Sequence, residues 1–205
     1  IVPVSAPTGF GMELLKETIA NTLLETPAPR NFGHPRLAVD RAFSPKGVGT
    51  VVTGTLAGGE LKTGDSLIAY PSGLKTSVRA IQNHSSSVDH AMPGMRTALN
   101  LPDLPLTSKG KKGVSRGNLL VGGSLAEASY EVDAELIRSV RPIPGQKGTL
   151  RPLKSNHRIY VHHGSGRTQA RVLFPEGNTL HPGESTIAQL RFDHPVHSFV
   201  GERIV

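Results

Sequence analysis

The sequence contains no cysteine and no tryptophan, and aromatic residues make up only 4% of it. Without cysteine the chain cannot form a disulfide, a thiolate zinc site or a cysteine nucleophile. No apolar run approaches the roughly 20 residues that a membrane-spanning helix requires, and the first residues lack the charged segment and apolar core of a secretion signal. We therefore expect a cytoplasmic protein with no membrane partner.

Hydrophobic residues are also scarce, at 37%, whereas glycine and proline are frequent, with 23 and 16 copies in 205 residues. This composition favours many short strands joined by tight turns over long helices. A chain of this length suits one large domain or two small ones. The first expectation is therefore a mainly β protein.

An excess of basic residues gives the chain a formal net charge of +7. Clustered lysine and arginine side chains attract phosphate groups through a long-range, salt-sensitive field. A nucleic acid is therefore one candidate partner. The alternative is a basic surface that only keeps the protein soluble, and charge alone leaves both interpretations open.

The residue pattern changes twice along the chain. Residues 1–26 contain a short apolar segment and an amphipathic helix from about Met12 to Leu24, and the proline-rich residues 27–35 are typical of a stiff linker. From residue 36 onward, short strands with period-two alternation recur roughly every 8–12 residues, which is typical of a β-sandwich or barrel. We place one β domain at residues 36–124 and another at residues 125–205, and we interpret the abrupt start and end as those of a fragment.

The glycine-rich stretch SPKGVGTVVTGTLAGG, residues 44–59, invites comparison with a phosphate-binding loop. Such a loop needs a lysine and a hydroxyl residue at the start of a helix. Here Gly49 leads instead into TVV, a run of strand formers. We therefore interpret the stretch as a hairpin in which Gly54 permits a bend or a close approach of two strands.

Nine histidines raise the question of a metal site, above all the adjacent pair His162 and His163. Neighbouring side chains on a strand point to opposite faces, so this pair cannot easily share one ion. No HExxH motif accompanies the pair, and the sequence lacks the GxSxG motif of a serine nucleophile. We expect neither a metal site nor a catalytic site in this chain.

Several longer stretches are similar to a known family. RLAVDRAFSPKGVGTVVTGTLAGGELKTGDSLIAYPSG resembles the start of the second domain of translational GTPases, and its VDRAF and KGVGTVVTGT segments most resemble selenocysteine-specific elongation factors. VHHGSGRTQARVLF and PGESTIAQLRFDHPV resemble the third domain of the same factors, so the resemblance covers essentially the whole chain. Elongation factor Tu shares the GTVVTG hairpin and is the alternative. It is disfavoured by the combination of Asp40, Arg41 and Arg96 and by the double-histidine strand.

The resemblance implies two consecutive antiparallel β-barrels, domains II and III of the factor, after a strand and a helix left from a GTPase domain. The backbone of Ser5 and Ala6 in VSAPTG would belong to the last guanine-side motif of that domain. The phosphate loop, the magnesium-binding threonine and the other GTPase motifs are absent from this chain. We therefore expect the fragment to be no enzyme and to hold no cofactor, and its longer parent to be a GTPase that uses GTP and Mg²⁺.

The resemblance also implies that the second domain holds the aminoacyl end of selenocysteyl-tRNA in a pocket built from Asp40, Arg41 and Arg96. A selenol is largely an anion near neutral pH, whereas the hydroxyl of the precursor serine is neutral. A cationic pocket can therefore separate the two amino acids.

Local periodicity around this pocket leaves two questions open. Leu37, Val39 and Phe43 are expected to alternate on the core face of one strand. Arg41 would then lie on an apolar face unless it sits at the rim of the barrel. Asp40 either binds the amino group of the aminoacyl ester or orients an arginine.

For the third domain, the resemblance implies contacts with the acceptor and T stems of the tRNA through phosphates and 2′-hydroxyls. The candidate residues are His162, His163, Arg167 and Arg171, and the alternative for each is an ordinary solvated strand face. The ribosome and an mRNA hairpin are expected as partners of further domains of the parent.

Overall fold

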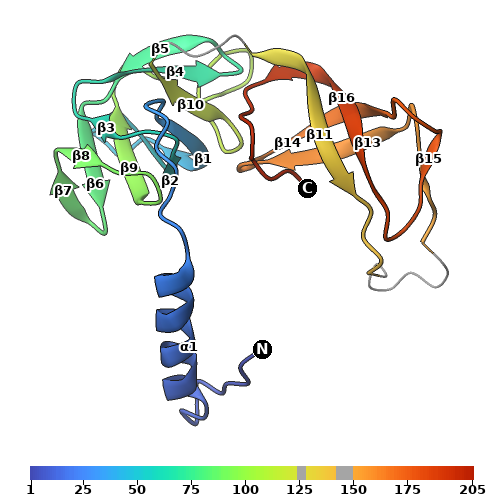
Figure 1. Cartoon of the computed structure of the whole chain (residues 1–205). Coiled ribbons are helices and arrows are strands. Elements are labelled where there is room, and N and C mark those ends of the chain that lie inside the picture. The colour runs from blue at the N-terminus through green and yellow to red at the C-terminus, as the bar shows by residue number, and fades with distance from the viewer. Residues whose placement is uncertain (124–127, 142–149) are drawn as a thin grey trace. The chain divides into compact units, whose positions relative to one another are not determined.

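The computed structural model describes residues 1–123, 128–141 and 150–205 (Figure 1). The chain divides into two compact units, residues 1–30 and residues 31–205. The first unit is mainly helical, and the second unit contains all the named strands in the described part of the chain.

Helix α1 (Met12–Glu25) dominates the smaller unit and confirms the predicted helix. None of its residues is buried, so the apolar side chains of Leu14, Ile19 and Leu23 lie open along it. This apolar stripe accounts for the amphipathic pattern seen in the sequence. In the described part of the chain, no helix is long and apolar enough to cross a membrane.

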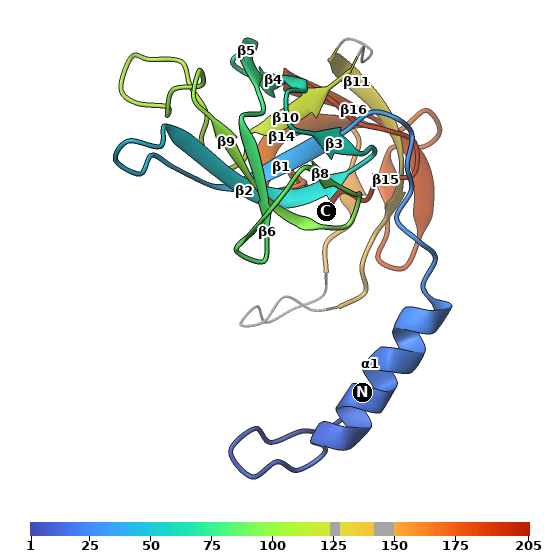
Figure 2. The same cartoon turned by 90° about the vertical axis from the view of Figure 1, so that its left-hand side faces the viewer.

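Eight strands from the described residues form the first antiparallel sheet of the larger unit, in the spatial order β5-β4-β10-β1-β2-β9-β6-β7. In this order β1 and β2 are the middle pair, with β10 and β9 on either side, and the strands can be followed by their labels in Figure 2. A two-stranded sheet, β3 with β8, accompanies it. The strand bounds are β1 (Arg36–Phe43), β2 (Thr50–Ala57), β3 (Leu61–Lys62), β4 (Ser66–Tyr70), β5 (Leu74–Ser77), β6 (Ala80–Asn83), β7 (Ser86–Val88), β8 (His90–Ala91), β9 (Arg96–Leu101) and β10 (Leu119–Gly122).

Alternation along these strands separates the core face of the first sheet from its outer face. Leu37, Val39, Val52, Leu56 and Leu99 are at most 1% exposed and belong to one hydrophobic cluster. Burying each such side chain contributes about 1.5–3 kcal/mol to folding. Side chains that alternate with them, such as Thr53 and Thr55 on β2, face outward, and this outer face carries the candidate site described below.

A second antiparallel sheet has its own hydrophobic core, and its order is β11-β16-β14-β13. A short pair, β12 with β15, accompanies it. The strand bounds are β11 (Ser129–Ile137), β12 (Leu153–Lys154), β13 (Arg158–His163), β14 (Gly166–Leu173), β15 (Thr179–Leu180) and β16 (Ser185–Val196).

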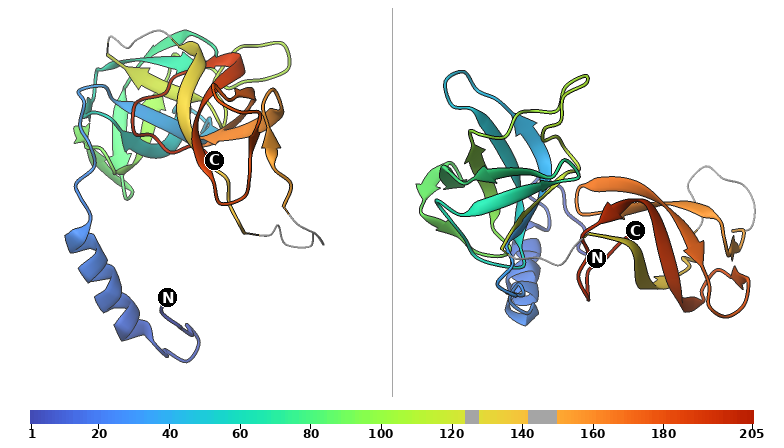
Figure 3. Two further views of the ribbon diagram at one scale, coloured as in Figure 1. Left: turned by 45° about the vertical axis from the view of Figure 1, so that its right-hand side comes forward. Right: turned by 90° about the horizontal axis from the view of Figure 1, so that it is seen from above.

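The fold class predicted from the sequence, a mainly β chain with two consecutive antiparallel sheets of the barrel type, is confirmed. The predicted boundary between the two β domains, at residues 124 and 125, lies outside the described residues. At the C-terminus, the backbone groups of Val205 and His162 exchange two hydrogen bonds of 2.6 and 3.0 Å. This pairing fastens the last residues along β13 (Figure 3).

The prediction that Phe43 lies on the core face is wrong, because β1 contains a β-bulge. The register with β2 runs from Val39 opposite Gly54 directly to Arg41 opposite Thr53, which leaves Asp40 as the extra residue. A bulge shifts the alternation of every later residue by one position. Ala42 consequently packs against the core, and Phe43 is 44% exposed.

Gly54 makes the close approach of β1 and β2 possible beside this bulge. A Cβ atom on Gly54 would lie only 2.3 Å from the carbonyl oxygen of Ala38 and 2.7 Å from Cδ2 of Leu37. Any side chain would therefore push the two strands apart. Of the two roles predicted for this glycine, a bend or a close approach of two strands, the close approach is confirmed.

Charged and aromatic side chains join the first sheet to the second. The Arg36 guanidinium on β1 lies 2.5 Å from a carboxylate oxygen of Glu202 and stacks over the ring of Phe199 at 4.1 Å. The other Glu202 oxygen lies 2.8 Å from Nε2 of His163. Burial raises the pKa of Glu202, but the hydrogen bond from His163 and the charge of Arg36 outweigh it and hold the pKa below its usual value.

A buried histidine makes the stability of this unit depend on pH. The His197 ring is 7% exposed and lies edge-on to Tyr70 at 3.9 Å between ring centres, and burial lowers its pKa. Below a pH of about 6.5 the unfolded chain therefore binds this proton more readily than the folded chain. We expect the free energy of unfolding to fall as the pH drops from 7.5 to 5.5, by at most about 1.4 kcal/mol per pH unit from this group.

Urea unfolding of wild type and of His197→Phe at the two pH values checks this expectation. The variant removes the titrating ring and keeps an aromatic side chain of similar size, so its unfolding free energy should change less between pH 7.5 and pH 5.5. Equal pH dependence in the two proteins would mean that His197 is not the source.

Candidate functional site

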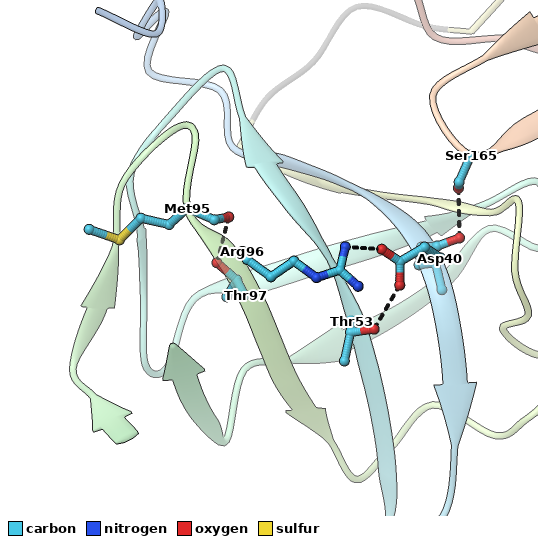
Figure 4. Close-up of polar contacts among 7 residues, drawn as sticks. Asp40, Thr53, Met95, Arg96, Thr97 and Ser165 are labelled. Carbon is cyan, nitrogen blue, oxygen red and sulfur yellow. Dashed lines mark hydrogen bonds and ion pairs between the residues drawn. The ribbon is translucent and has the colours of Figure 1, made fainter. Parts of the chain in front are cut away.

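Asp40 and Arg96 meet on the outer face of the first sheet (Figure 4), and Arg41, the residue after Asp40, lies opposite Thr53 on the same face. The bulge in β1 produces this arrangement, because Val39 before it faces the core, whereas Arg41 after it lies opposite the outward-facing Thr53. Arg96 is the first residue of β9 and lies on the other side of β2. Two distant segments of the sequence therefore meet across three adjacent strands.

The carboxylate of Asp40 is the centre of the cluster. Thr53 donates its hydroxyl to Oδ1 at 2.7 Å, and Nη1 of Arg96 forms an ion pair with Oδ2. Partial burial raises the pKa of Asp40, but the hydrogen bonds from Arg96 and Thr53 and the charges of Arg96 and Arg41 together hold the pKa below its usual value. Asp40 is therefore ionised at neutral pH.

The backbone on both sides of Arg96 is also held in place. The side-chain amide of Asn83 donates to the Arg96 carbonyl oxygen at 2.7 Å, and the buried Thr97 donates its hydroxyl to the carbonyl of Met95 at 3.1 Å. The Arg96 side chain is 54% exposed and that of Asp40 is 27% exposed. The arginine is thus oriented by Asp40 and Asn83 and still open to a ligand.

Arg41 differs from Arg96 in its contacts. It is exposed, and none of the ion pairs in the described part of the chain involves it. The cluster of two arginines and one aspartate carries a net charge of +1. Because both carboxylate oxygens of Asp40 are engaged by Thr53 and Arg96, the geometry favours the interpretation in which Asp40 orients an arginine over the one in which it binds an amino group.

Thr53 and Asn83 were missed by sequence reasoning. Their roles depend on which residues face each other across strands, and a single sequence contains no signal for that register when a bulge intervenes. The TVVTG motif pointed to a strand, but not to the side of the strand on which Thr53 would meet Asp40.

The outer face of the second sheet carries a row of three exposed arginines on three adjacent strands. Arg158 on β13 lies opposite Arg171 on β14, which lies opposite Arg191 on β16. Arg158 and Arg191 have carboxylate partners, Asp193 at 3.5 Å and Glu131 at 3.0 Å. Arg171 instead donates to the neutral side-chain oxygen of Asn156 at 3.0 Å. Only Arg171 of this row was predicted, because the register that aligns the three is not local.

Two further predicted residues lie on the same strands as this row. His162 is exposed on β13, opposite the exposed Arg167 of β14. The Arg167 guanidinium stacks over the ring of Tyr160 at 4.5 Å. His163 differs from these residues, because it is partly buried and its ring contacts Glu202. The structure therefore groups His162, Arg167 and Arg171 and separates His163 from them.

Ser5 and Ala6 lie in the smaller unit, in a turn before α1. The amide of Ser5 donates to the carbonyl of Phe10 at 3.0 Å, and Ala6 is exposed. Ser5 and Ala6 thus belong to the unit of residues 1–30, and the cluster around Asp40 belongs to the unit of residues 31–205.

Relatives of known name match the whole chain. The selenocysteine-specific elongation factor of Desulfomicrobium baculatum is 38% identical over 206 residues, which is 100% of this chain and 30% of that protein. The factor of the same name from Escherichia coli is 32% identical over 98% of this chain and 29% of its own length. No protein-family model matches the chain. The chain therefore spans about 30% of the length of the curated relatives that it matches.

Solved structures of elongation factors also match the fold of this chain. A crystal structure of the bacterial selenocysteine-specific elongation factor EF-Sec has a TM-score of 0.75 and 31% identity, and the match covers 100% of this chain and 31% of that one. The apo form of translation elongation factor SelB from Methanococcus maripaludis has a TM-score of 0.73 and 27% identity over 98% of this chain and 44% of that one. By sequence and by fold, the chain belongs, as a segment, to the family of selenocysteine-specific elongation factors.

Proposed function

We propose that this segment of an elongation factor binds selenocysteyl-tRNA, with the cluster of Asp40, Arg41 and Arg96 receiving the selenocysteyl side chain. The observation that carries the proposal is the geometry of this cluster. Arg96 is oriented by an ionised Asp40 and remains half exposed, and Arg41 beside it has no carboxylate partner in the described part of the chain.

Charge gives such a site a means of discrimination. A selenolate and an arginine at about 4 Å attract each other by roughly 4 kcal/mol at an effective dielectric constant near 20, and desolvation removes much of this. A net preference of about 1–3 kcal/mol corresponds to roughly tenfold to hundredfold tighter binding. The neutral hydroxyl of a seryl ester gains no such attraction, so seryl-tRNA binds less tightly.

The rest of the proposed activity belongs to the longer protein of which this segment is a part. That protein would bind GTP and Mg²⁺, hydrolyse GTP and deliver selenocysteyl-tRNA to the ribosome, with an mRNA hairpin read by domains outside this segment. The 205 residues lack the phosphate loop that GTP hydrolysis requires. We therefore expect this segment alone to have no GTPase activity.

A competition between two aminoacyl-tRNAs tests the proposal. The full-length factor is titrated with selenocysteyl-tRNA and with seryl-tRNA of the same tRNA sequence, at pH 7 with GTP present. We expect at least tenfold tighter binding of selenocysteyl-tRNA. Equal affinities would favour the alternative function, a general aminoacyl-tRNA carrier of the elongation factor Tu type.

The arginine row of the second sheet fits the backbone of a tRNA stem. Arg158 and Arg191 already pair with carboxylates, whereas Arg171 between them has no carboxylate partner in the described part of the chain. A phosphate beside Arg171 would supply that counter-charge. The exposed side chains of His162 and Arg167 lie opposite each other on the same two strands and extend this surface. We propose that this surface contacts the tRNA stems, and we leave His163 out because its ring contacts Glu202.

Salt dependence measures the number of such contacts. Arg171→Ala should weaken tRNA binding to a similar degree whichever amino acid is attached, and it should reduce the slope of log K against log salt by about 1. Lys154→Ala, which removes an exposed charge from β12, is the matched control and should leave the slope close to that of wild type. An unchanged slope in Arg171→Ala would remove this residue from the interface.

A further inference from the structure

We propose that Ser165 is a positioning residue that couples the β13–β14 hairpin of the second sheet to the aminoacyl cluster of the first. The inference rests on the proposed function for its biological meaning, because the residue acts through Asp40 and Arg41. The coupling depends on one hydrogen bond between the two sheets, beside the bulge in β1.

Ser165 lies in the turn between β13 and β14, and its hydroxyl donates to the carbonyl oxygen of Val39 at 2.6 Å (Figure 4). Val39 directly precedes Asp40, the extra residue of the bulge. The same carbonyl oxygen also accepts the amide of Gly117 at 2.9 Å. Both of its lone pairs are therefore used, one of them by a residue 126 positions away in sequence.

The carbonyl of Val39 determines the direction in which the bulge leaves the strand. It belongs to the peptide unit that links Val39 to Asp40, so a rotation of this unit changes where the Asp40 side chain points. A bulged residue has lost its partner in the strand ladder and depends on other contacts for its orientation. The bond from Ser165 supplies such a contact immediately before Asp40.

The turn that carries Ser165 is built for close approach to β1. Gly164 has φ +56°, and a Cβ atom there would lie 2.9 Å from Cβ of Ala38. On the other side of this glycine, His163 contacts Glu202, which is paired with Arg36 at the start of β1. The hairpin therefore contacts β1 at two places. His163 reaches Arg36, the first residue of β1, through Glu202, and Ser165 bonds directly to Val39 beside the bulge.

The two strands joined by this turn also carry residues proposed to meet the tRNA stem. His162 and Arg167 lie opposite each other, one residue pair beyond His163 and Gly166. A tRNA stem that engages Arg167 would therefore hold the turn in position, and with it the peptide unit before Asp40. Binding of the tRNA stem would then strengthen binding of the amino acid, and binding of the amino acid would strengthen binding of the stem. This mutual effect is a coupling free energy between the two sites.

The alternative is that Ser165 only fastens the two sheets together. Ser165→Ala and Ser165→Thr separate the two possibilities, because threonine keeps the hydroxyl and alanine removes it. Ser155→Ala is the matched control, since Ser155 is also partly buried and also bonds to the backbone, accepting from the amide of Phe174 at 3.1 Å within the second sheet.

The experiment on the full-length factor measures binding of selenocysteyl-tRNA, seryl-tRNA and deacylated tRNA. We expect Ser165→Ala to reduce the preference for selenocysteyl-tRNA over seryl-tRNA at least threefold, and to change the affinity for deacylated tRNA less than twofold. Ser165→Thr should restore the preference, and Ser155→Ala should keep it. A wild-type preference in Ser165→Ala, or a loss of affinity for all three tRNAs in equal proportion, would overturn the coupling.

A second readout on the 205-residue chain distinguishes failure of this inference from failure of the proposed function. Carbon-13 NMR follows the titration of the Asp40 carboxylate in wild type and in Ser165→Ala. If the bulge loosens, the contacts of Asp40 with Arg96 and Thr53 weaken, and the pKa of Asp40 should rise toward its usual value. An unchanged Asp40 titration would refute the coupling even if the wild-type factor showed no tRNA preference, whereas a raised pKa without any wild-type tRNA preference would refute only the function.

Discussion

Arg96→Ala in the full-length factor should reduce the preference for selenocysteyl-tRNA over seryl-tRNA by roughly tenfold to a hundredfold, which corresponds to about 1–3 kcal/mol. The variant removes the guanidinium that Asp40 orients toward solvent. It also leaves the Asp40 carboxylate without its ion-pair partner, so the net charge of the cluster falls from +1 to 0. Affinity for seryl-tRNA should change little, because the serine hydroxyl gains nothing from the positive charge. Equilibrium binding of both aminoacyl-tRNAs measures the effect.

Arg79→Ala is the matched control for this variant. Arg79 is an exposed arginine between β5 and β6 of the same sheet, outside the cluster, so its removal changes the net charge of the protein equally. A comparable loss of preference in Arg79→Ala would indicate a general charge effect. A full wild-type preference in Arg96→Ala would exclude Arg96 from the aminoacyl site.

Glu202→Ala should lower the free energy of unfolding of the 205-residue chain by about 3 kcal/mol. The Glu202 side chain is 19% exposed and that of its partner Arg36 is 12% exposed, so the variant leaves a mostly buried guanidinium without a counter-charge. The His163 ring and the amide of Phe199 lose the same carboxylate as an acceptor. Removal of one partner from a buried, hydrogen-bonded pair leaves an uncompensated charge, and that accounts for the large cost. Urea unfolding at pH 7 measures it.

The exposed ion pair between Arg191 and Glu131 provides the contrast. Its two side chains are 55% and 53% exposed, and water and salt screen such a pair, so Glu131→Ala should cost no more than about 1 kcal/mol. If Glu202→Ala cost as little as Glu131→Ala, the contact between β1 and the C-terminal residues would not contribute to stability as its burial indicates.

Much of the fold followed from local patterns in the sequence. The helix at Met12 was visible because its apolar residues recur at helical spacing, and the strands around Leu37 and Val52 were visible because apolar and polar residues alternate with period two. The bulge at Asp40 was not visible, because nothing in VDRAF distinguishes a regular strand from one with an extra residue. That single residue made the prediction for Phe43 wrong and brought Arg41 to the outer face.

The candidate site shows the same division between local and non-local information. The family resemblance selected Asp40, Arg41 and Arg96, and the structure adds that Asp40 holds Arg96 and leaves Arg41 open. Thr53 could not be identified beforehand, because its role depends on pairing between separate strands. The alignment of Arg158 with Arg171 and Arg191 was hidden for the same reason.

The proposed function requires that the cluster of Asp40, Arg41 and Arg96 recognise negative charge on the side chain of the aminoacyl ester. Cysteinyl-tRNA tests it most directly, because a thiol has a pKa of about 8.5 and changes from mostly neutral to mostly anionic between pH 7 and pH 9. With a tenfold to hundredfold preference for the anionic form, the affinity of the full-length factor for cysteinyl-tRNA should rise roughly fivefold to twentyfold over this range relative to seryl-tRNA, and the rise should disappear in Arg96→Ala. A ratio of cysteinyl-tRNA to seryl-tRNA affinity that stays constant from pH 7 to pH 9 would contradict the claim.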